Sequence, residues 1–286
     1  MTFTTRFAPS PTGPLHLGHA FSALTAKERA DAANGRFLLR IDDLDRTRAR
    51  PEWEAQIYDD LTWLGLSWPM PVRHQSDHLS TYRAALQYLW ARGLLYPCTC
   101  SRRDIADAVS APHEGPDGLI YPGTCRPEQP PTGPMPDTAL RLDMRRAFGT
   151  LNAQALRPPL AFHESGAGPN GETGLIVLGA EYMTRNVGDV VLARPSLGAS
   201  YHLSVVIDDA TQAITHVIRG QDLFAATSIH VVLQRLLHLS TPSYHHHRLI
   251  RDDMGKRLAK RDDARAIASY RKSGVSLKEL RAMLGL

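Results

Sequence analysis

The sequence has no long hydrophobic run, and it contains few cysteines. No segment approaches the roughly 18 uninterrupted apolar residues of a membrane span. Residues 1–5 (MTFTT) lack the charged-then-apolar pattern of a signal peptide, and no internal repeat is visible. Three cysteines, an odd number, do not make a disulfide framework. We therefore expect a cytoplasmic protein that has no membrane partner.

The composition is that of an ordinary globular protein with a mild positive charge. The 286 residues are 43% hydrophobic, which is enough for one large domain or two modest ones. Charged residues make up 22% of the chain, so a disordered or fibrous protein is not indicated. The net charge of +4 suits a polyanionic partner such as RNA, but so mild an excess is weak evidence by itself.

The first 35 residues predict a strand, a tight turn and the start of a helix. Residues 2–7 are rich in β-branched and aromatic side chains, which is typical of a strand. The prolines and glycine of residues 9–14 then interrupt regular structure. Alanine and leucine favour a helix from His19 onwards, and Gly35 marks its end.

A turn of this kind predicts an anion-binding site. The start of a helix offers free backbone N–H groups and a positive dipole end, which suit a phosphate. His16 and His19 lie three residues apart and can add donors to the same anion. Gly18 between them has no side chain, so a flat base or a ribose could approach the backbone closely. The alternative is a proline-rich turn that carries two solvated histidines.

The remaining pattern alternates strands and helices, which predicts the α/β class. Residues 37–42 form a largely apolar run that ends in acid and predict a buried parallel strand. The other expected strands are residues 187–192, 201–208 and 214–219, and the expected helices are residues 51–64, 80–92, 229–240 and a short one opened by the capping box at 276–279. Asp42, Asp43 and Asp45 follow the 37–42 strand, at the end where open α/β sheets hold their ligands. For Asp43 and Asp45 we favour a charged loop instead.

Residues 94–136 differ from the rest because prolines crowd them and all three cysteines fall there. A segment this rich in loops cannot build much core of its own. Cys98, Cys100 and Cys125 could bind one tetrahedral Zn²⁺ together with a fourth ligand, for which His113 is the generic candidate. Three buried free thiols are the alternative.

Residues 6–19 (RFAPSPTGPLHLGH) resemble the first signature, called HIGH, of class I aminoacyl-tRNA synthetases, and specifically that of the glutamyl branch. Leu17 stands where the family has isoleucine. The resemblance extends from about residue 5 to about residue 265. It implies a Rossmann-type catalytic domain that joins L-glutamate to the α-phosphate of ATP, with Mg²⁺ accompanying the ATP.

The resemblance also implies roles for individual residues. The implied glutamate contacts are Arg6, Phe7, Ala8, Pro9, Ser10, Asp42, Tyr201 and Arg219. The implied ATP contacts are His16, Gly18, His19 and Lys260, of which His16, His19 and Lys260 are the catalytic set. Two arginine forks suit the two carboxylates of glutamate, and one acid suits its ammonium group. Asp42 departs from the family, which usually has glutamate there, so either the strand end lies closer to the substrate or a water bridges the gap.

Residues 257–261 (RLAKR) occupy the place of the family's second signature, KMSKS, in a degenerate form. Our alignment keeps the second lysine as Lys260, and a shifted alignment would make Lys256 the working lysine. In the family this loop closes on ATP and stabilises charge on the leaving pyrophosphate. The nearby His245, His246 and His247 could suggest a metal, but strand alternation would point His246 away from its neighbours.

The cysteine pattern and the short C-terminus narrow the resemblance. Cys-x-Cys followed by Tyr-x-x-x-Cys resembles a variant in which Cys98, Cys100, Tyr121 and Cys125 hold one structural Zn²⁺. Only 26 residues follow Lys260, where full glutamyl-tRNA synthetases have an anticodon-reading domain. Both features resemble the glutamyl-Q tRNA(Asp) synthetases, a group that loads glutamate onto the queuosine base of tRNA(Asp). A truncated enzyme that charges the 3′ end of tRNA(Glu) and a non-catalytic RNA-binding paralogue are the alternatives.

The expected organisation follows from these assignments. We expect the first half of the catalytic domain at 1–93, a zinc-binding insertion at 94–136, the second half with an acceptor-type insertion at 137–240, and the second-signature loop with short C-terminal helices at 241–286. We expect the protein to act as a monomer on L-glutamate, ATP and tRNA(Asp) carrying queuosine.

Overall fold

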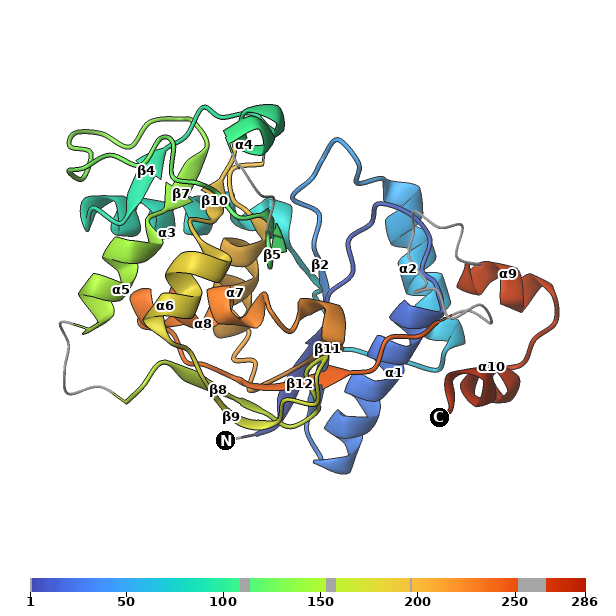
Figure 1. Cartoon of the computed structure of the whole chain (residues 1–286). Helices are drawn as coiled ribbons and strands as arrows, with labels where there is room; N and C mark the ends of the chain where they lie inside the picture. Colours follow the sequence, from blue (N-terminus) through green and yellow to red (C-terminus); the bar gives the residue numbers. More distant parts are fainter. Residues whose placement is uncertain (1, 109–113, 153–157, 196, 252–265) are drawn as a thin grey trace.

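Two groups of mainly parallel strands lie side by side at the centre of the molecule (Figure 1). The structure is a computed structural model that describes residues 2–108, 114–152, 158–195, 197–251 and 266–286. The first group has the order β1-β2-β3, all parallel, with β1 at Thr4–Phe7, β2 at Arg36–Ile41 and β3 at Arg73–His74. The second has the order β11-β12-β8-β9, with β11 at His216–Gly220, β12 at Ser243–His247, β8 at Ala161–Glu164 and β9 at Gly174–Val177.

The two groups meet where β1 lies beside the start of β11. The backbone N–H of Thr215 donates to the carbonyl of Thr4 at 3.0 Å, and the Thr215 hydroxyl accepts from the Thr4 N–H at 2.8 Å. β11, β12 and β8 run parallel, and only β9 is antiparallel to its neighbour. The predicted α/β class with a parallel sheet is therefore confirmed.

Helices pack against the sheet and bury apolar side chains against it. They include α1 at Leu17–Ala32, α2 at Pro51–Trp63, α3 at Leu79–Ala91, α7 at Tyr201–Thr211 and α8 at Thr227–Leu236. Ala20, Ala23 and Leu24 of α1 are buried in one core with Leu39 and Ile41 of β2. Among the described residues, no helix is long and apolar enough to cross a membrane.

A separate antiparallel sheet, which begins in the proline-rich residues 94–136 and continues beyond them, lies above the parallel strands in Figure 1. Its order is β10-β7-β4, with β4 at Leu95–Pro97, β7 at Leu140–Leu142 and β10 at Val191–Ala193. This region also contains α4 at Arg102–Ala108, a hairpin of β5 (Glu114–Gly115) and β6 (Gly118–Leu119), α5 at Met144–Asn152, α6 at Ala180–Tyr182, and a π-helical turn at Met183–Val187. The short 3₁₀ turns are Gln75–His78 and Gln221–Leu223.

The chain ends in two short helices that pack against its beginning (Figure 1). They are α9 at Ile267–Lys272 and α10 at Leu277–Leu284. Ile267, Leu280 and Leu284 are buried in the same core as the side chains of α1 and α2. The predicted capping box is confirmed, because the Ser276 and Glu279 side chains each bond to the other's backbone N–H.

Two of the expected strands are wrong. Residues 201–208 form most of helix α7, because an apolar run of this length suits a buried helix as well as a strand and Ser200 caps its N-terminus. In residues 187–192 only Val191 and Leu192 belong to a strand, since Gly188 breaks the backbone at φ 70° after the π-helical turn. The strand predicted at 214–219 is confirmed as β11, and the helix predicted at 229–240 is confirmed but ends at Leu236.

Candidate active site

One cavity of about 240 Å³ opens where the carboxyl ends of β1, β2 and β11 meet the N-terminus of α1. Nine of the residues that the sequence assigned to glutamate or ATP binding line it: Arg6, Phe7, Ala8, His16, Gly18, His19, Asp42, Tyr201 and Arg219. They come from four separate parts of the chain. The fold thus brings the residues expected to bind glutamate together with those expected to bind ATP.

The two signature histidines cap the first turn of α1. The Nδ1 atom of His16 accepts from the Gly18 backbone N–H at 3.1 Å, and the Nδ1 atom of His19 accepts from the His16 N–H at 3.1 Å. The N–H groups of His19 and Ala20 donate to the His16 carbonyl. The expectation of free backbone donors is therefore wrong for these groups. Because each Nδ1 accepts, Nε2 is the ring nitrogen that carries the hydrogen when the ring is neutral.

Gly18 leaves little room for a side chain beside the ring of His16. A Cβ atom on residue 18 would lie 3.0 Å from Cε1 of His16 and 3.1 Å from its Nδ1. These contacts are tighter than ordinary van der Waals packing, so the His16 ring would have to shift by a few tenths of an ångström to admit a side chain here. This reason adds to the close approach of a base or ribose that the sequence suggested.

Pro9 and Ser10 do not line the cavity. The carbonyl of Pro9 instead accepts from the backbone N–H of Asp42 at 3.0 Å, which fixes the end of β2 against the turn. The Ser10 carbonyl accepts from Thr12 at 2.9 Å, and the Ser10 residue is exposed. Their predicted contacts with glutamate remain predictions.

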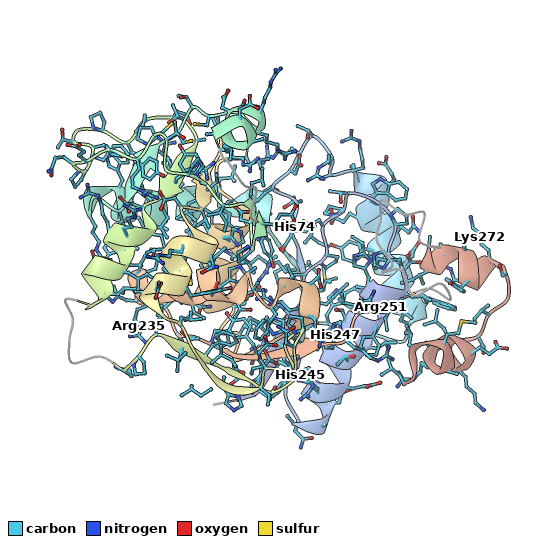
Figure 2. The ribbon with its side chains drawn as sticks, in the orientation of Figure 1. His74, Arg235, His245, His247, Arg251 and Lys272 are labelled. Atoms are coloured by element: carbon cyan, nitrogen blue, oxygen red, sulfur yellow. The ribbon has the colours of Figure 1, made fainter. Side chains whose placement is uncertain are left out.

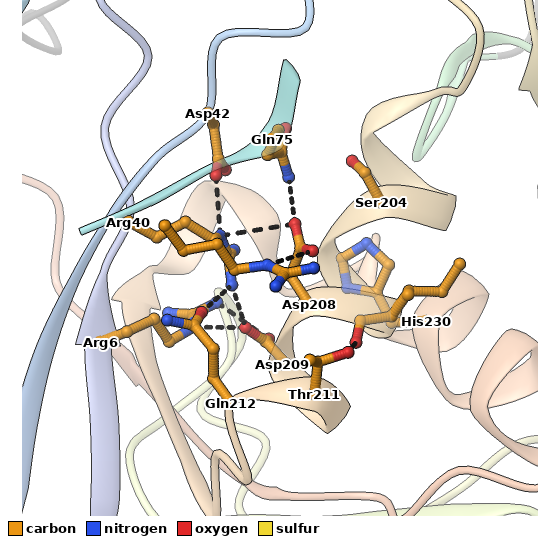
Figure 3. Close-up of polar contacts among 12 residues, drawn as sticks. Arg6, Arg40, Asp42, Gln75, Ser204, Asp208, Asp209, Thr211, Gln212 and His230 are labelled. Carbon is orange, nitrogen blue, oxygen red and sulfur yellow. Dashed lines mark hydrogen bonds and ion pairs between the residues drawn. The ribbon is translucent and has the colours of Figure 1, made fainter. Parts of the chain in front are cut away.

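A buried network of charges supports one wall of the cavity (Figure 3). Arg40 has no exposed surface and donates to Asp42 at 2.8 Å and to Asp209 at 2.7 Å. Asp209 also binds both Nε and Nη2 of Arg6, at 2.9 and 3.2 Å. The neighbouring acid, Asp208, accepts from Arg73 at 2.8 Å and lies 3.8 Å from Arg40.

Three arginines thus face three aspartates, so the network is neutral overall. Arg6 already has a bidentate carboxylate partner, and it brings no unbalanced charge to the cavity. Sequence reasoning missed Arg40, Asp208 and Asp209. The available signals were a charged residue inside the apolar strand 37–41 and two adjacent acids at the end of the apolar run 203–207.

Asp42 lies at the cavity and is strongly affected by its burial. Desolvation raises the pKa of Asp42 to about 6, although the adjacent Arg40 guanidinium pulls in the opposite direction. Its Oδ1 atom accepts from Arg40. The carboxylate is therefore mainly ionised at pH 7, and it lines the cavity together with Arg6, Ala8 and a second acid, Asp222.

Arg219 differs from Arg6 because it has no carboxylate partner among the described residues. It is 6% exposed, and its donors reach His246 at 3.1 Å, His230 at 3.2 Å and Thr227 at 2.6 Å. All three of these partners are uncharged when the histidines are neutral. A buried cation without an anion is costly unless a ligand supplies one, so the site favours an anionic ligand at Arg219.

Tyr201 is the first residue of α7 and is 39% exposed. Its ring packs edge-on against the rings of His202 and His230, with centroids 5.6 Å apart in both pairs. The residue therefore forms part of the cavity rim, from a helix rather than from the expected strand.

The three consecutive histidines of β12 point to different partners. His245 contacts Arg29 of α1 at 2.8 Å, His247 contacts Ser22 of α1 at 2.6 Å, and His246 bonds to the buried Glu164 of β8. Figure 2 labels His245 and His247 at the side of the sheet near α1. The alternation expected for a strand is confirmed, and in the described part of the chain these histidines do not form a cluster with metal-ligand spacing.

The three cysteines do come together, around Tyr121. Their sulfur atoms lie within 4.8 Å of one another, and Cys100 and Cys125 are 3.3 Å apart. The Tyr121 hydroxyl is 3.5 Å from the sulfur of Cys98 and 3.4 Å from that of Cys100. Zn–S bonds of about 2.3 Å and a Zn–O bond of about 2.0 Å at a tetrahedral angle would place S and O about 3.5 Å apart. The donor set therefore fits one tetrahedral metal ion.

The surroundings of this cluster favour a thiolate at Cys125, whereas at Cys100 the hydrogen bond with Tyr121 is outweighed by burial and the hydrogen bond with Cys125, which raise the pKa of Cys100. The guanidinium of Arg141 donates to Cys98 Sγ at 3.2 Å and stacks on the Tyr121 ring at 3.8 Å. Burial raises the pKa of Cys125, but hydrogen bonds from Tyr121 and the Thr99 backbone outweigh it and lower the pKa to about 6.

Four of the residues considered in the sequence lie outside the described residues. They are Lys260, Lys256, Arg257 and His113. The role of Lys260 in catalysis and the choice of lysine in the second signature remain predictions.

Comparison with known proteins gives one matching family. The model described as "tRNA synthetases class I (E and Q), catalytic domain" matches residues 2–113 and 174–286. A glutamyl-Q tRNA(Asp) synthetase of Rhodobacter capsulatus is 58% identical over an alignment of 288 residues, gaps included, that covers 99% of each chain. One of Symbiobacterium thermophilum is 41% identical over an alignment of 286 residues, gaps included, that covers 95% of this chain and 82% of that protein.

Solved structures share the fold. The crystal structure of a glutamate-tRNA synthetase from Elizabethkingia anophelis superposes with a TM-score of 0.67 at 24% identity. The match covers 92% of this chain and 53% of that one, so the chain spans about half the length of the solved enzyme. A methionyl-tRNA synthetase of Mycobacterium tuberculosis superposes with a TM-score of 0.60 at 13% identity.

Proposed function

The chain belongs to the class I tRNA synthetases for glutamate and glutamine, and from this premise we propose that it activates L-glutamate with ATP and transfers it to the queuosine base of tRNA(Asp). As a member of this family it is a ligase-type enzyme. The observation that carries the choice of acceptor is the 58% identity to a protein named for that reaction, over 99% of both chains. We place this activity in the cytoplasm and assign it to the monomer.

In the proposed first step, a carboxylate oxygen of glutamate attacks the α-phosphorus of ATP, and pyrophosphate leaves. No protein nucleophile is needed, so the protein acts by positioning and by stabilising charge. Arg219 holds one substrate carboxylate, and Asp42 holds the ammonium group. The Nε2–H groups of His16 and His19 donate to the phosphates, and Lys260 stabilises the departing pyrophosphate. Bound Mg²⁺ would add charge neutralisation on the phosphates.

Glutamate activation should not require tRNA. The buried contacts of Arg6, Arg40 and Asp42 hold this wall of the cavity in place without RNA. We expect the isolated protein to catalyse glutamate-dependent exchange of labelled pyrophosphate into ATP, with glutamine and aspartate as negative controls. Exchange that begins only after tRNA is added would contradict this expectation.

The acceptor is tested by offering labelled glutamate and ATP with tRNA(Asp) that contains or lacks queuosine. We expect label only on the queuosine-containing tRNA, in its anticodon-loop fragment after nuclease digestion. Label on the 3′ end of tRNA(Glu) would instead identify a glutamyl-tRNA synthetase. Binding of tRNA without any exchange or transfer would identify an RNA-binding paralogue.

Cys98, Cys100, Tyr121 and Cys125 are proposed to hold one structural Zn²⁺. The cluster lies in the region of β4 and β7, and none of its four residues lines the cavity of Arg219 and Asp42. We expect about one Zn²⁺ per chain in protein purified without chelator, as a closed four-ligand site would hold. Cys125→Ala should lose the metal and loosen the loop, measured by elemental analysis and limited proteolysis. Metal-free protein with intact activity would remove the zinc site from the proposal.

A further inference from the structure

Arg219 stands in the middle of a continuous chain of hydrogen bonds that the proposed reaction does not use. On one side its Nη1 atom lies 3.2 Å from Nδ1 of His230. Nε2 of His230 lies 3.2 Å from Nδ1 of His202, and Nε2 of His202 lies 3.3 Å from Oδ1 of Asp117. On the other side Nε of Arg219 donates to Nε2 of His246 at 3.1 Å, and Nδ1 of His246 bonds to Glu164.

The chemistry of arginine fixes the direction of every bond in this chain. A guanidinium has only donors, so Nδ1 of His230 must accept from it and cannot carry a hydrogen. The hydrogen of the His230 ring therefore lies on Nε2 and is donated to Nδ1 of His202. His202 in turn carries its hydrogen on Nε2 and donates it to Asp117. Each histidine has one possible tautomer, and the bonds run outward from Arg219 to a carboxylate.

The same reasoning applies on the opposite side. Nε2 of His246 accepts from Arg219, so its hydrogen lies on Nδ1 and is donated to Glu164. Burial would raise the pKa of Glu164, but its hydrogen bonds from His246 lower it below the usual range, which keeps it an acceptor. Burial and the nearby Arg219 hold the pKa of His230 well below its usual value, so the ring stays neutral.

The residues linked by these hydrogen bonds come from distant parts of the fold. Asp117 lies in the turn of the β5–β6 hairpin, and His202 and His230 lie on α7 and α8. Figure 3 shows His230 beside the charge network. His202 and His230 are 6% and 1% exposed, whereas the Asp117 side chain is 38% exposed. The hairpin of the proline-rich region is thereby connected to the cavity through buried rings.

We propose that His230, His202 and Asp117 form a positioning relay that orients the Arg219 fork for a substrate carboxylate and ties its position to the β5–β6 hairpin. This inference rests on the proposed function, in which Arg219 binds glutamate. The relay residues lie behind Arg219 and touch no reacting atom. Because His230, His202 and His246 are neutral, no anion in the described ranges contacts Arg219 directly, and its charge remains available for the ligand. The anionic residues, Asp117 and Glu164, lie beyond these histidines.

Asp117 offers the cleanest test because it is the exposed end of the relay. Asp117→Ala removes the last acceptor, and Asp117→Asn keeps an acceptor oxygen without the charge. We expect Asp117→Ala to raise the KM for glutamate about two- to tenfold, because one hydrogen bond that orients Arg219 through the two histidines is lost. The KM for ATP should not change. Asp117→Asn should lie closer to the wild type. Asp107→Ala, on exposed helix α4 of the same region, is the matched control and should change neither constant.

Two replacements of His230 separate orientation from mere packing. Asparagine places its amide oxygen near the Nδ1 position, so His230→Asn keeps an acceptor for Arg219. Glutamine places its amide near the Nε2 position, so His230→Gln keeps the link to His202 and loses that acceptor. We expect His230→Gln to raise the KM for glutamate more than His230→Asn does. Equal effects of the two variants on both substrates would assign His230 a structural role and overturn the relay.

The hydrogen-bond order can be read without any activity. In ¹⁵N-histidine-labelled protein, long-range ¹H–¹⁵N spectra should show the hydrogen on Nε2 in His230 and His202 and on Nδ1 in His246. A hydrogen on Nδ1 of His230 would overturn the relay, as would unchanged glutamate kinetics in Asp117→Ala when the wild-type enzyme exchanges pyrophosphate. A wild-type protein with these tautomers but no glutamate-dependent exchange would overturn the proposed function instead.

Discussion

Replacement of Arg219 by alanine should weaken glutamate binding far more than ATP binding. The side chain lines the cavity, and in the described part of the chain no carboxylate pairs with it. Its loss would leave a substrate carboxylate without a charged donor pair, at about 2–4 kcal/mol. That range corresponds to a rise of roughly 30- to 1,000-fold in the KM for glutamate, measured by pyrophosphate exchange.

Arg219→Lys is the companion variant, because lysine keeps the charge and loses the planar fork. Arg219→Lys should recover part of the glutamate affinity that Arg219→Ala loses. If alanine disturbs the packing around His246 and Thr227, which Arg219 also contacts, the longer lysine side chain should preserve it. Circular dichroism and thermal unfolding of both variants separate misfolding from lost binding. Equal increases in the Michaelis constants for glutamate and ATP would place the substrate carboxylate elsewhere.

Replacement of Asp42 by asparagine should lower kcat/KM for glutamate by one to two orders of magnitude. A neutral amide pairs poorly with an ammonium group, and the loss of a buried charged partner costs about 2–3 kcal/mol. Asp42→Glu restores the residue usual in the family and should retain activity. If Asp42→Asn leaves glutamate activation unchanged, Asp42 is not the ammonium ligand. Asp222, which also lines the cavity, then becomes the candidate, because Asp43 and Asp45 pair with Ser76 and Arg48 outside it.

The pH profile gives a second test of the same carboxylate. Burial raises the pKa of Asp42 to about 6, so the carboxylate is ionised above this pH and becomes protonated below it. Protonation removes the charge that pairs with the ammonium group. In the wild-type enzyme kcat/KM for glutamate should therefore fall about tenfold for each pH unit below about 6. The Asp42→Asn variant should lack this acidic limb.

The strand, turn and helix of residues 4–32 were predictable because local signals determine them. Prolines and glycine mark the turn, and the apolar pattern of α1 needs no distant partner to be recognised. The same signals predicted one shared site for His16 and His19, and both line the cavity, whereas Phe7 was assigned to it by the family resemblance. By contrast, the apolar residues 201–208 are compatible with a strand or a buried helix, and packing against α8 and β10 decides between them.

The partners of each charged residue could not be predicted, because they lie far apart in the sequence. Arg6 meets Asp209, and Arg40 meets Asp208 and Asp209, from strands and a helix about 170 to 200 residues apart along the chain. Sequence reasoning assigned Arg6 and Arg219 the same role as carboxylate clamps. The fold distinguishes them, since one has an internal carboxylate and the other is surrounded by neutral groups.

At position 18, the residue that best favours a helix differs from the residue that best fits beside the His16 ring. Alanine exceeds glycine in helix propensity by about 1 kcal/mol, so a methyl group at this second residue of α1 would strengthen the helix. The same methyl group would collide only with the ring of His16, within 3.1 Å. The gain in helix propensity would then come with a displaced signature histidine and a weakened cap on the same helix. Substitutions that improve thermal stability across the chain would therefore be harmful at this position, where the weaker helix former keeps the histidine cap in place.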